Sequence, residues 1–200
     1  SGRFVVTPES RKNEILQVIK SGLEDISVSR PSSKISWGIP VPGDATQTMY
    51  VWFEALMNYI TTLGYPNHPD FETFWPANVQ VIGKDILRFH AAIWPAMLMG
   101  LGIPLPERLF VHGFVTSGGQ KMSKTLGNVV DPLDVAAEYG VDAFRYYFLR
   151  YGPVVDDVDY TQERFEAAYN SELANELGNA VQRVASMAMK YMDGVLGDVP

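Results

Sequence analysis

Cysteine is absent from the 200 residues of this chain. Its absence excludes disulfides and thiolate zinc sites, and we expect no zinc ligands and no other protein-bound metal in this chain. Apolar runs long enough to cross a bilayer are also missing, and no signal peptide is recognisable. We therefore expect a cytoplasmic protein that has no membrane partner.

Basic residues are few. The chain has 16 lysines and arginines against 23 aspartates and glutamates, which gives a formal net charge of −7. Non-specific binding of nucleic acid depends on clustered positive charge, so any contact with RNA must be local. The composition is otherwise that of a globular protein of one or two domains, with 46% hydrophobic and 12% aromatic residues.

Residues 118–128, Gly-Gly-Gln-Lys-Met-Ser-Lys-Thr-Leu-Gly-Asn, form the stretch with the clearest chemistry. They follow an apolar run at 109–115 that is typical of a buried strand. They precede Asp131-Pro132, which predicts a helix with aspartate at the N-cap and proline at its first position. The stretch is therefore expected to be a loop between a strand and a helix.

Lys121 and Lys124 lie three residues apart in this loop, on either side of Ser123. Two ammonium groups and a hydroxyl suit a polyphosphate, whose charge must be neutralised as it shifts in a transition state. A solvated surface loop is the commoner explanation of such a short pattern. The spacing alone leaves both interpretations open.

A strand at 79–83, a glycine, an acid and a helix from about 86 to 101 follow one another in the middle of the chain. Doubly wound α/β folds bind nucleotides at the carboxyl edge of the sheet in this arrangement. Asp85 could accept hydrogen bonds from ribose hydroxyls there, next to Gly83. It could equally be the N-cap of the helix, and both roles are compatible.

Two stripes of mainly aromatic residues have helical spacing. The first comes at the end of an expected strand at 48–53 and continues into a helix that runs to about residue 63; the second lies on the helix after Asp85. Such stripes are more often core than pocket. Their members are Trp52, Ala55 and Tyr59 in the first, and Ile86, His90 and Trp94 in the second.

The two ends of the chain carry further candidates. An expected helix from about residue 8 to 22 is followed by a short strand at 25–31 that contains Arg30. The acids at 156–159 are interpreted as a solvated loop. From Thr161 a helix is predicted to about residue 195, with a clean apolar stripe. Its opposite side carries Asn179, Arg183 and Lys190.

The sequence Lys121-Met122-Ser123-Lys124-Thr125 resembles the KMSKS signature loop of class I aminoacyl-tRNA synthetases, with threonine as its last residue. The resemblance implies a loop that closes over ATP with Mg²⁺, in which Lys121 and Lys124 are catalytic and Ser123 and Lys124 bind ATP. Gly83 and Asp85 match a second family motif, which implies that they hold the adenosine ribose.

The two stripes resemble the methionine pocket of methionyl-tRNA synthetases. The resemblance implies that Trp52, Ala55, Tyr59, Ile86, His90 and Trp94 shape a site for the side chain of L-methionine, and that Arg30 faces its carboxylate. Aromatic walls contact a soft thioether well. The resemblance also implies that Asn179, Arg183 and Lys190 bind tRNA(Met), including the initiator tRNA, whose exposed bases can stack on guanidinium groups.

The implied fold is α/β, the second half of a Rossmann-like doubly wound parallel sheet. The implied segments are the end of an inserted connective domain (1–36), the second half of the catalytic domain with the signature loop (37–128), a stem-contact module (129–168) and the first part of a helical anticodon-binding domain (169–200). The implied enzyme is a methionine–tRNA ligase.

The family's other signature, His-x-Gly-His, is absent from this sequence. We therefore expect a missing amino-terminal half to be a partner, and this chain to be inactive alone. Two alternatives remain open: a non-enzymatic tRNA-binding remnant, and another class I synthetase, such as one for leucine, valine or cysteine. The six-residue pocket argues against the latter.

Overall fold

The computed structural model describes residues 4–195, apart from the side chain of Lys124. The chain divides into two compact units, Ser1–His112 and Gly113–Pro200. Within residues 4–195 no helix is long and apolar enough to span a membrane.

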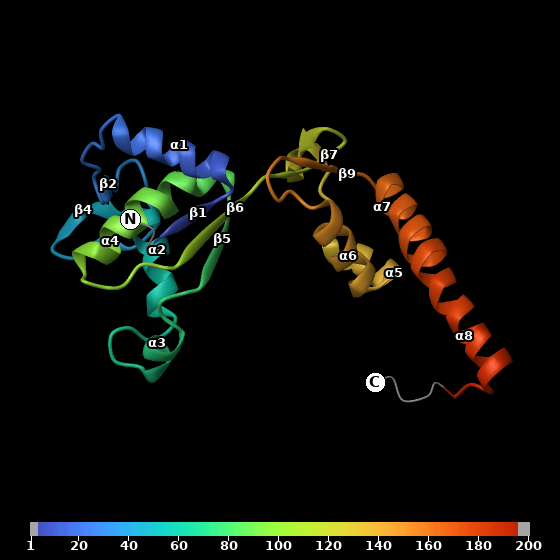
Figure 1. Ribbon diagram of the computed structural model, residues 1–200. Coiled ribbons are helices and arrows are strands. Elements are labelled where there is room, and N and C mark those ends of the chain that lie inside the picture. The colour runs from blue at the N-terminus through green and yellow to red at the C-terminus, as the bar shows by residue number, and fades with distance from the viewer. Residues whose placement is uncertain (1–3, 196–200) are drawn as a thin grey trace. The chain divides into compact units, whose positions relative to one another are not determined.

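The first unit contains a parallel three-stranded sheet in the order β1-β6-β5 (Figure 1). Its strands are β1 (Val5–Thr7), β5 (Val79–Gly83) and β6 (Arg108–His112). Val79–Gly83 pairs in register with Arg108–His112, which places Gly83 beside His112 at the carboxyl end. The expected α/β class with a parallel sheet is confirmed, as is the strand at 79–83.

Helices cover one face of this sheet. Ile15 of α1 (Glu9–Lys20) packs against Ile82 and Leu109, together with Leu87 and Ala91 of the helical segment after β5. That segment consists of a 3₁₀ turn (Lys84–Ile86), a π-helix (Phe89–Ile93) and α4 (Trp94–Gly100). It is less regular than the helix that we expected from about 86 to 101, and the π-helical turn lies just before Pro95, which cannot donate a backbone hydrogen bond.

Residues near the start of the chain contribute to this sheet, because β1 pairs with β6 and α1 packs on it. The assignment of residues 1–36 to the end of an inserted domain stays a prediction. The apolar faces of β1 and α1 are buried by the strands that come later in the chain, and no local pattern reveals such a long-range pairing.

A second, antiparallel sheet in the first unit has the order β2-β4-β3 and consists of β2 (Ser29–Pro31), β3 (Pro40–Val41) and β4 (Asp44–Met49). Helix α2 (Val51–Thr61) follows directly. The strand expected at 48–53 is therefore wrong in its second half. A short apolar run fits a strand and a buried helix equally, and here Tyr50 accepts the first helical hydrogen bonds from Phe53 and Glu54.

A short helix, α3 (Pro69–Phe74), lies between α2 and β5. Pro69 occupies its first turn, where proline is tolerated because the N–H of that position has no helical partner. The His68 side chain caps the helix by accepting a hydrogen bond from the Asp70 N–H at 3.2 Å.

The second unit has a small mixed sheet in the order β8-β7-β9. Strand β7 (Val115–Ser117) forms a hairpin with β8 (Gln120–Lys121) and pairs in parallel with β9 (Val158–Tyr160). The signature loop, residues 118–128, belongs to the compact unit that begins at Gly113. The domain boundaries expected at 128/129 and 168/169 stay predictions.

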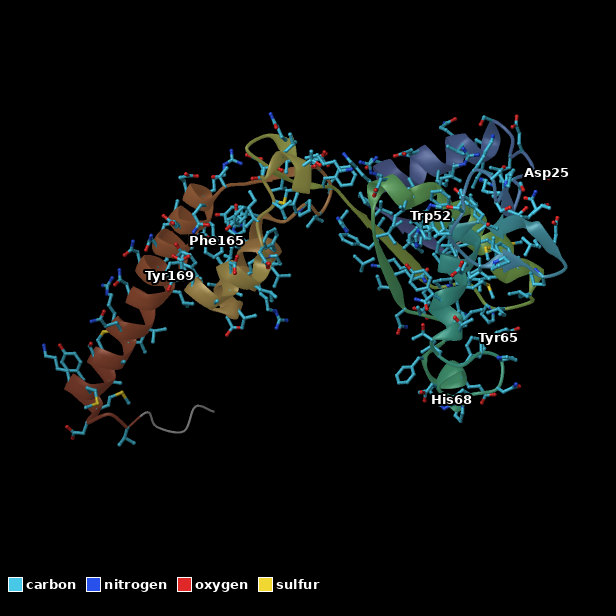
Figure 2. All side chains as sticks on the ribbon, turned by 180° about the vertical axis from the view of Figure 1, so that it is seen from behind. Asp25, Trp52, Tyr65, His68, Phe165 and Tyr169 are labelled. Carbon is cyan, nitrogen blue, oxygen red and sulfur yellow. The ribbon has the colours of Figure 1, made fainter. Side chains whose placement is uncertain are left out.

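Helices build the rest of this unit: α5 (Pro132–Tyr139), α6 (Val141–Tyr151), α7 (Gln162–Ala168), a π-helical stretch (Tyr169–Gly178) and α8 (Asn179–Met192). Phe165 and Tyr169 point toward α5 and α6 in a core that includes Val135 and Tyr147 (Figure 2). Asp131 caps α5 as predicted, by accepting from the Leu133 N–H at 2.8 Å.

Candidate functional site

Helix α2 and the helical segment at 84–100 bring the two stripes of the first unit together. Tyr59 lies 5.7 Å from the His90 ring and 5.9 Å from the Trp94 ring, centroid to centroid. Trp52 meets His90 edge-on at 6.2 Å. The spacing of seven residues places Trp52 and Tyr59 on one side of α2, and Ala55 shares that side. We call the six residues Trp52, Ala55, Tyr59, Ile86, His90 and Trp94 the aromatic wall.

A chain of hydrogen bonds fixes the protonation of His90. Its Nδ1 lies 3.0 Å from the Ile86 carbonyl oxygen, which can only accept, so Nδ1 carries the proton. Its Nε2 is then an acceptor, and it lies 3.0 Å from the Tyr59 hydroxyl, which donates. The hydroxyl proton of Tyr59 is thereby directed at His90, and its oxygen lone pairs stay available.

Both members of this pair are neutral near pH 7. Burial lowers the pKa of His90, an effect that the hydrogen bond to Ile86 partly opposes. Burial raises the pKa of Tyr59. Desolvation disfavours the charged form of each group, so the aromatic wall carries no charge. An uncharged surface of this kind suits an apolar, polarisable ligand group.

The members of the wall differ in depth. His90 is 2% exposed and Trp94 is fully enclosed, whereas Tyr59 is 37% exposed and Ala55 is also exposed. Trp94 packs with Leu56, Ile60 and Leu98 and thus belongs to the second core cluster. A ligand on this surface would touch Ala55 and Tyr59 directly, while Trp94 would support Tyr59 from behind.

Trp52 also borders a cavity that no sequence pattern predicted. Its ring stacks on Phe89 at 4.1 Å, and Figure 2 shows it among the packed side chains of the first unit. The cavity has a volume of about 350 Å³. It lies between the segment at 23–28, the start of α2 and residues 88–97, and Trp52 is the one member of the aromatic wall in its lining.

Arg30 contacts the backbone of its own segment and the ring of Tyr50. Its guanidinium donates to the carbonyl oxygens of Ser27 and Ser29 at 2.9 and 2.8 Å, and it lies 3.9 Å from the Tyr50 ring centroid. Tyr50 lines the cavity beside Trp52. The described contacts of Arg30 therefore anchor the segment at 27–29, and its role toward a carboxylate stays a prediction.

Gly83 and Asp85 lie at the carboxyl end of β5. The N-cap of the 3₁₀ turn is Gly83, in extended conformation and without a side-chain cap. Asp85 is inside the turn, so the interpretation of Asp85 as N-cap is wrong. Its side chain is exposed. An exposed carboxylate at this edge of a parallel sheet is placed where doubly wound folds bind a ribose.

In the second unit, one asparagine holds the backbone of the signature loop. Asn128 Oδ1 accepts from the Ser123 N–H at 2.8 Å, and its Nδ2 donates to the Lys121 carbonyl oxygen at 3.3 Å. The Lys121 side chain is exposed, with Nζ 5.1 Å from the Phe114 ring centroid. Lys124 begins a 3₁₀ turn (Lys124–Leu126), and its side chain lies outside the described residues.

The acids before α7 are not the solvated loop that we expected. Asp159 Oδ1 accepts from the Gly119 N–H at 2.7 Å and from the Thr116 hydroxyl at 2.8 Å. Asp157 Oδ1 accepts from the Phe114 N–H at 2.8 Å. The hydrogen bond from Gly119, followed by that from Thr116, lowers the pKa of Asp159. A Val-Asp-Tyr alternation at 158–160 was the available signal for a strand here.

Asn179, Arg183 and Lys190 are all exposed on α8. The apolar stripe of the same helix is exposed too: Val181 and Val184 are 61% and 56% accessible. The described residues thus leave both sides of this helix uncovered. Among residues 4–195, no group of three or more histidines or acids is placed to hold a metal ion.

The family model described as tRNA synthetases class I (M) matches residues 3–185. This chain belongs to the class I methionyl-tRNA synthetase family. Among curated family members, the methionine–tRNA ligase of Thermosynechococcus vestitus is 50% identical over 199 residues, which are 97% of this chain and 37% of that protein. That of Caldanaerobacter subterraneus subsp. tengcongensis is 52% identical over 193 residues, 96% of this chain and 30% of that protein.

Solved structures of methionyl-tRNA synthetases agree with this assignment. Mycobacterium tuberculosis methionyl-tRNA synthetase in complex with methionyl-adenylate matches with a TM-score of 0.85 and 46% identity, over 98% of this chain and 39% of that one. Its apo form matches with a TM-score of 0.80 and 42% identity, over 98% of this chain and 38% of that one. The chain therefore spans between 30% and 39% of the length of these methionyl-tRNA synthetases.

Proposed function

We propose that this chain supplies the second catalytic half and the tRNA-facing part of a methionine–tRNA ligase. In that reaction a carboxylate oxygen of methionine attacks the α-phosphorus of ATP, and pyrophosphate leaves. A ribose hydroxyl at the end of tRNA(Met) then attacks the methionyl carbonyl carbon, and AMP leaves. The family membership and the methionyl-adenylate complex of a relative support this proposal.

The neutral aromatic wall is the observation that carries the proposal. A thioether offers little charge and weak hydrogen bonding, so a surface for it must be apolar and polarisable, with at most one directed polar atom. Tyr59 provides that atom: its hydroxyl proton is donated to His90, its oxygen can still accept a hydrogen bond, and the residue as a whole is 37% exposed. An amino acid with a charged side chain would lose its hydration here without compensation.

For ATP, the chain offers groups of suitable chemistry in each unit. The Asp85 carboxylate is an acceptor for ribose hydroxyls, and Gly83 leaves room beside it. Lys121 and Lys124 would neutralise charge on the phosphates, with Ser123 as a further donor. Mg²⁺ bound to the phosphates would supply additional positive charge when present.

For tRNA, the exposed polar residues of α8 are the candidates. We propose that Asn179, Arg183 and Lys190 contact exposed bases of tRNA(Met), by hydrogen bonds to base edges and by stacking on the guanidinium group. Three such residues on one helix suit local recognition in a chain whose net charge is −7. A cytoplasmic location remains a prediction from the composition.

The parallel sheet supports the proposal that a companion half completes the catalytic fold. Parallel sheets are normally covered on both faces. Here Val79 and Val81, on the face opposite the helices, are 49% and 62% exposed. A polypeptide that carries the family's His-x-Gly-His motif would cover this face and complete the doubly wound sheet.

The test is reconstitution. The chain is combined with an amino-terminal half that carries His-x-Gly-His, and ATP–pyrophosphate exchange is measured with methionine, leucine, valine and cysteine. We expect exchange with methionine alone, followed by charging of tRNA(Met). Exchange with a different amino acid would favour another class I synthetase. Binding of tRNA(Met) without any exchange would favour a non-enzymatic remnant.

A further inference from the structure

A carboxylate from β9 holds the beginning of the signature loop. Asp159 Oδ1 accepts two hydrogen bonds, from the Gly119 N–H at 2.7 Å and from the Thr116 hydroxyl at 2.8 Å. Both are short bonds to an ionised acceptor, the stronger class of hydrogen bond. Thr116 and Asp159 are also direct neighbours in the pairing of β7 with β9.

The Gly119 bond lies two residues before Lys121. Gly118 and Gly119 have φ angles of +61° and +75°, a backbone conformation that residues other than glycine rarely adopt. This turn presents the Gly119 N–H to Asp159. Asn128 holds the other side of the loop through Lys121 and Ser123. Hydrogen bonds to Asp159 on one side and to Asn128 on the other therefore hold the segment that carries the signature lysines.

Asp159 is itself fixed by the start of the long helix. Thr161 caps α7 by accepting from the Arg164 N–H at 3.3 Å. The Arg164 guanidinium reaches back and donates to the Asp159 carbonyl oxygen at 3.1 Å. The helix that begins here continues through the π-helical stretch into α8, which carries the proposed tRNA contacts. Asp159 is thus hydrogen-bonded both to the first turn of that helix and to the signature loop.

We propose that Asp159 is a positioning residue that ties the signature loop to the start of the long helix and so sets the loop's resting position. The effect of this link on catalysis rests on the proposed function, whereas the hydrogen-bonded link between the loop and the helix does not. When the loop is to close over phosphates, the Gly119 bond is the contact that must stretch or pivot. A shift of the helix start would be transmitted to the lysines through the same contact.

The tie is tested first in the chain alone, by amide hydrogen exchange at Gly119. We compare the wild type with Asp159→Ala, Asp159→Asn and, as matched control, Asp156→Ala, an exposed acid in the same link. Loss of the acceptor in Asp159→Ala should speed exchange at Gly119 by about tenfold. Asp159→Asn keeps an acceptor oxygen and the shape of the side chain, so a smaller increase is expected. The control should match the wild type.

Catalysis is tested second, in the enzyme reconstituted with the amino-terminal half. Asp159→Ala should lower kcat for ATP–pyrophosphate exchange while the KM for methionine stays within about twofold, because the loop acts on phosphate charge in the transition state. Unchanged Gly119 exchange in both Asp159 variants would overturn the tie, whatever the activity. Faster Gly119 exchange with an unchanged kcat would overturn its catalytic role. An inactive wild type would instead contradict the proposed function.

Discussion

Trp94 offers the sharpest test of how the aromatic wall is built. Its side chain is fully enclosed and packs with Leu56, Ile60 and Leu98, and its ring lies 5.9 Å from that of Trp75. Trp94→Ala removes an indole from a closed site and leaves a cavity. Substitutions of this kind cost about 3–5 kcal/mol of folding free energy. Such a loss would disturb every property of the first unit, including the binding of any substrate.

Trp94→Phe separates packing from polarity. The indole Nε1 is buried and has no hydrogen-bond partner among the described residues. An unsatisfied buried donor costs roughly 1–3 kcal/mol. Phenylalanine keeps one aromatic ring and removes that donor. The stability gained by removing the unsatisfied donor therefore offsets most of the stability lost with the smaller side chain. We expect the free energy of unfolding of Trp94→Phe to lie within about 1 kcal/mol of the wild type.

Tryptophan fluorescence in urea measures both variants. The four tryptophans are residues 37, 52, 75 and 94, so the signal reports on the first unit alone. Three of them remain in each variant. The midpoint should fall strongly in Trp94→Ala and little in Trp94→Phe, with similar slopes. A loss in Trp94→Phe as large as that in Trp94→Ala would show instead that the indole N–H contributes to stability through a hydrogen-bond partner.

Three further predictions concern the site. In the reconstituted enzyme, Tyr59→Phe removes the hydroxyl and leaves His90 Nε2 without a donor; the KM for methionine should rise about tenfold and that for ATP stay within twofold, and an equal rise in both would contradict the assignment. Because burial lowers the pKa of His90 below its ordinary 6.5, the unfolded state binds the proton more readily, so the first unit should lose stability as the pH falls below about 6.5. His90→Gln should flatten that profile in urea titrations; a pH dependence as steep as that of the wild type would exclude His90 as its cause. Lys124→Ala should lower the rate of adenylate formation by about a hundredfold, measured in single turnovers, while methionine binding is nearly unchanged. A rate within twofold of the wild type would favour a solvated surface loop without a catalytic role.

Local patterns predicted the elements whose signals are local. The strand at 79–83 and the cap at Asp131 follow from short-range chemistry that the rest of the fold does not alter. The common face of Trp52 and Tyr59 follows from helical spacing alone, even though the helix begins earlier than we expected. These features could be predicted because one segment contains all of their causes.

Features that depend on distant segments could not be predicted. β1 belongs to the sheet because β6, a hundred residues later, pairs with it. Asp159 appeared to be one acid among several in a polar link, and its role depends on the pairing of β7 with β9 and on the Gly119 turn. The depth of Trp94, which separates its role from that of Tyr59, is likewise a property of the assembled core.

We proposed above that this chain holds one half of a methionine-activating site. Methionine-dependent ATP–pyrophosphate exchange tests this proposal when it is measured for the purified 200-residue chain alone and then with the amino-terminal half added in trans. Correct placement of the reacting atoms supplies much of the rate of such a reaction, and it needs groups from both halves. We predict no exchange above background from the chain alone and clear exchange once the other half is present. Measurable exchange by the chain alone would show that one half of the site is sufficient and would overturn the proposal.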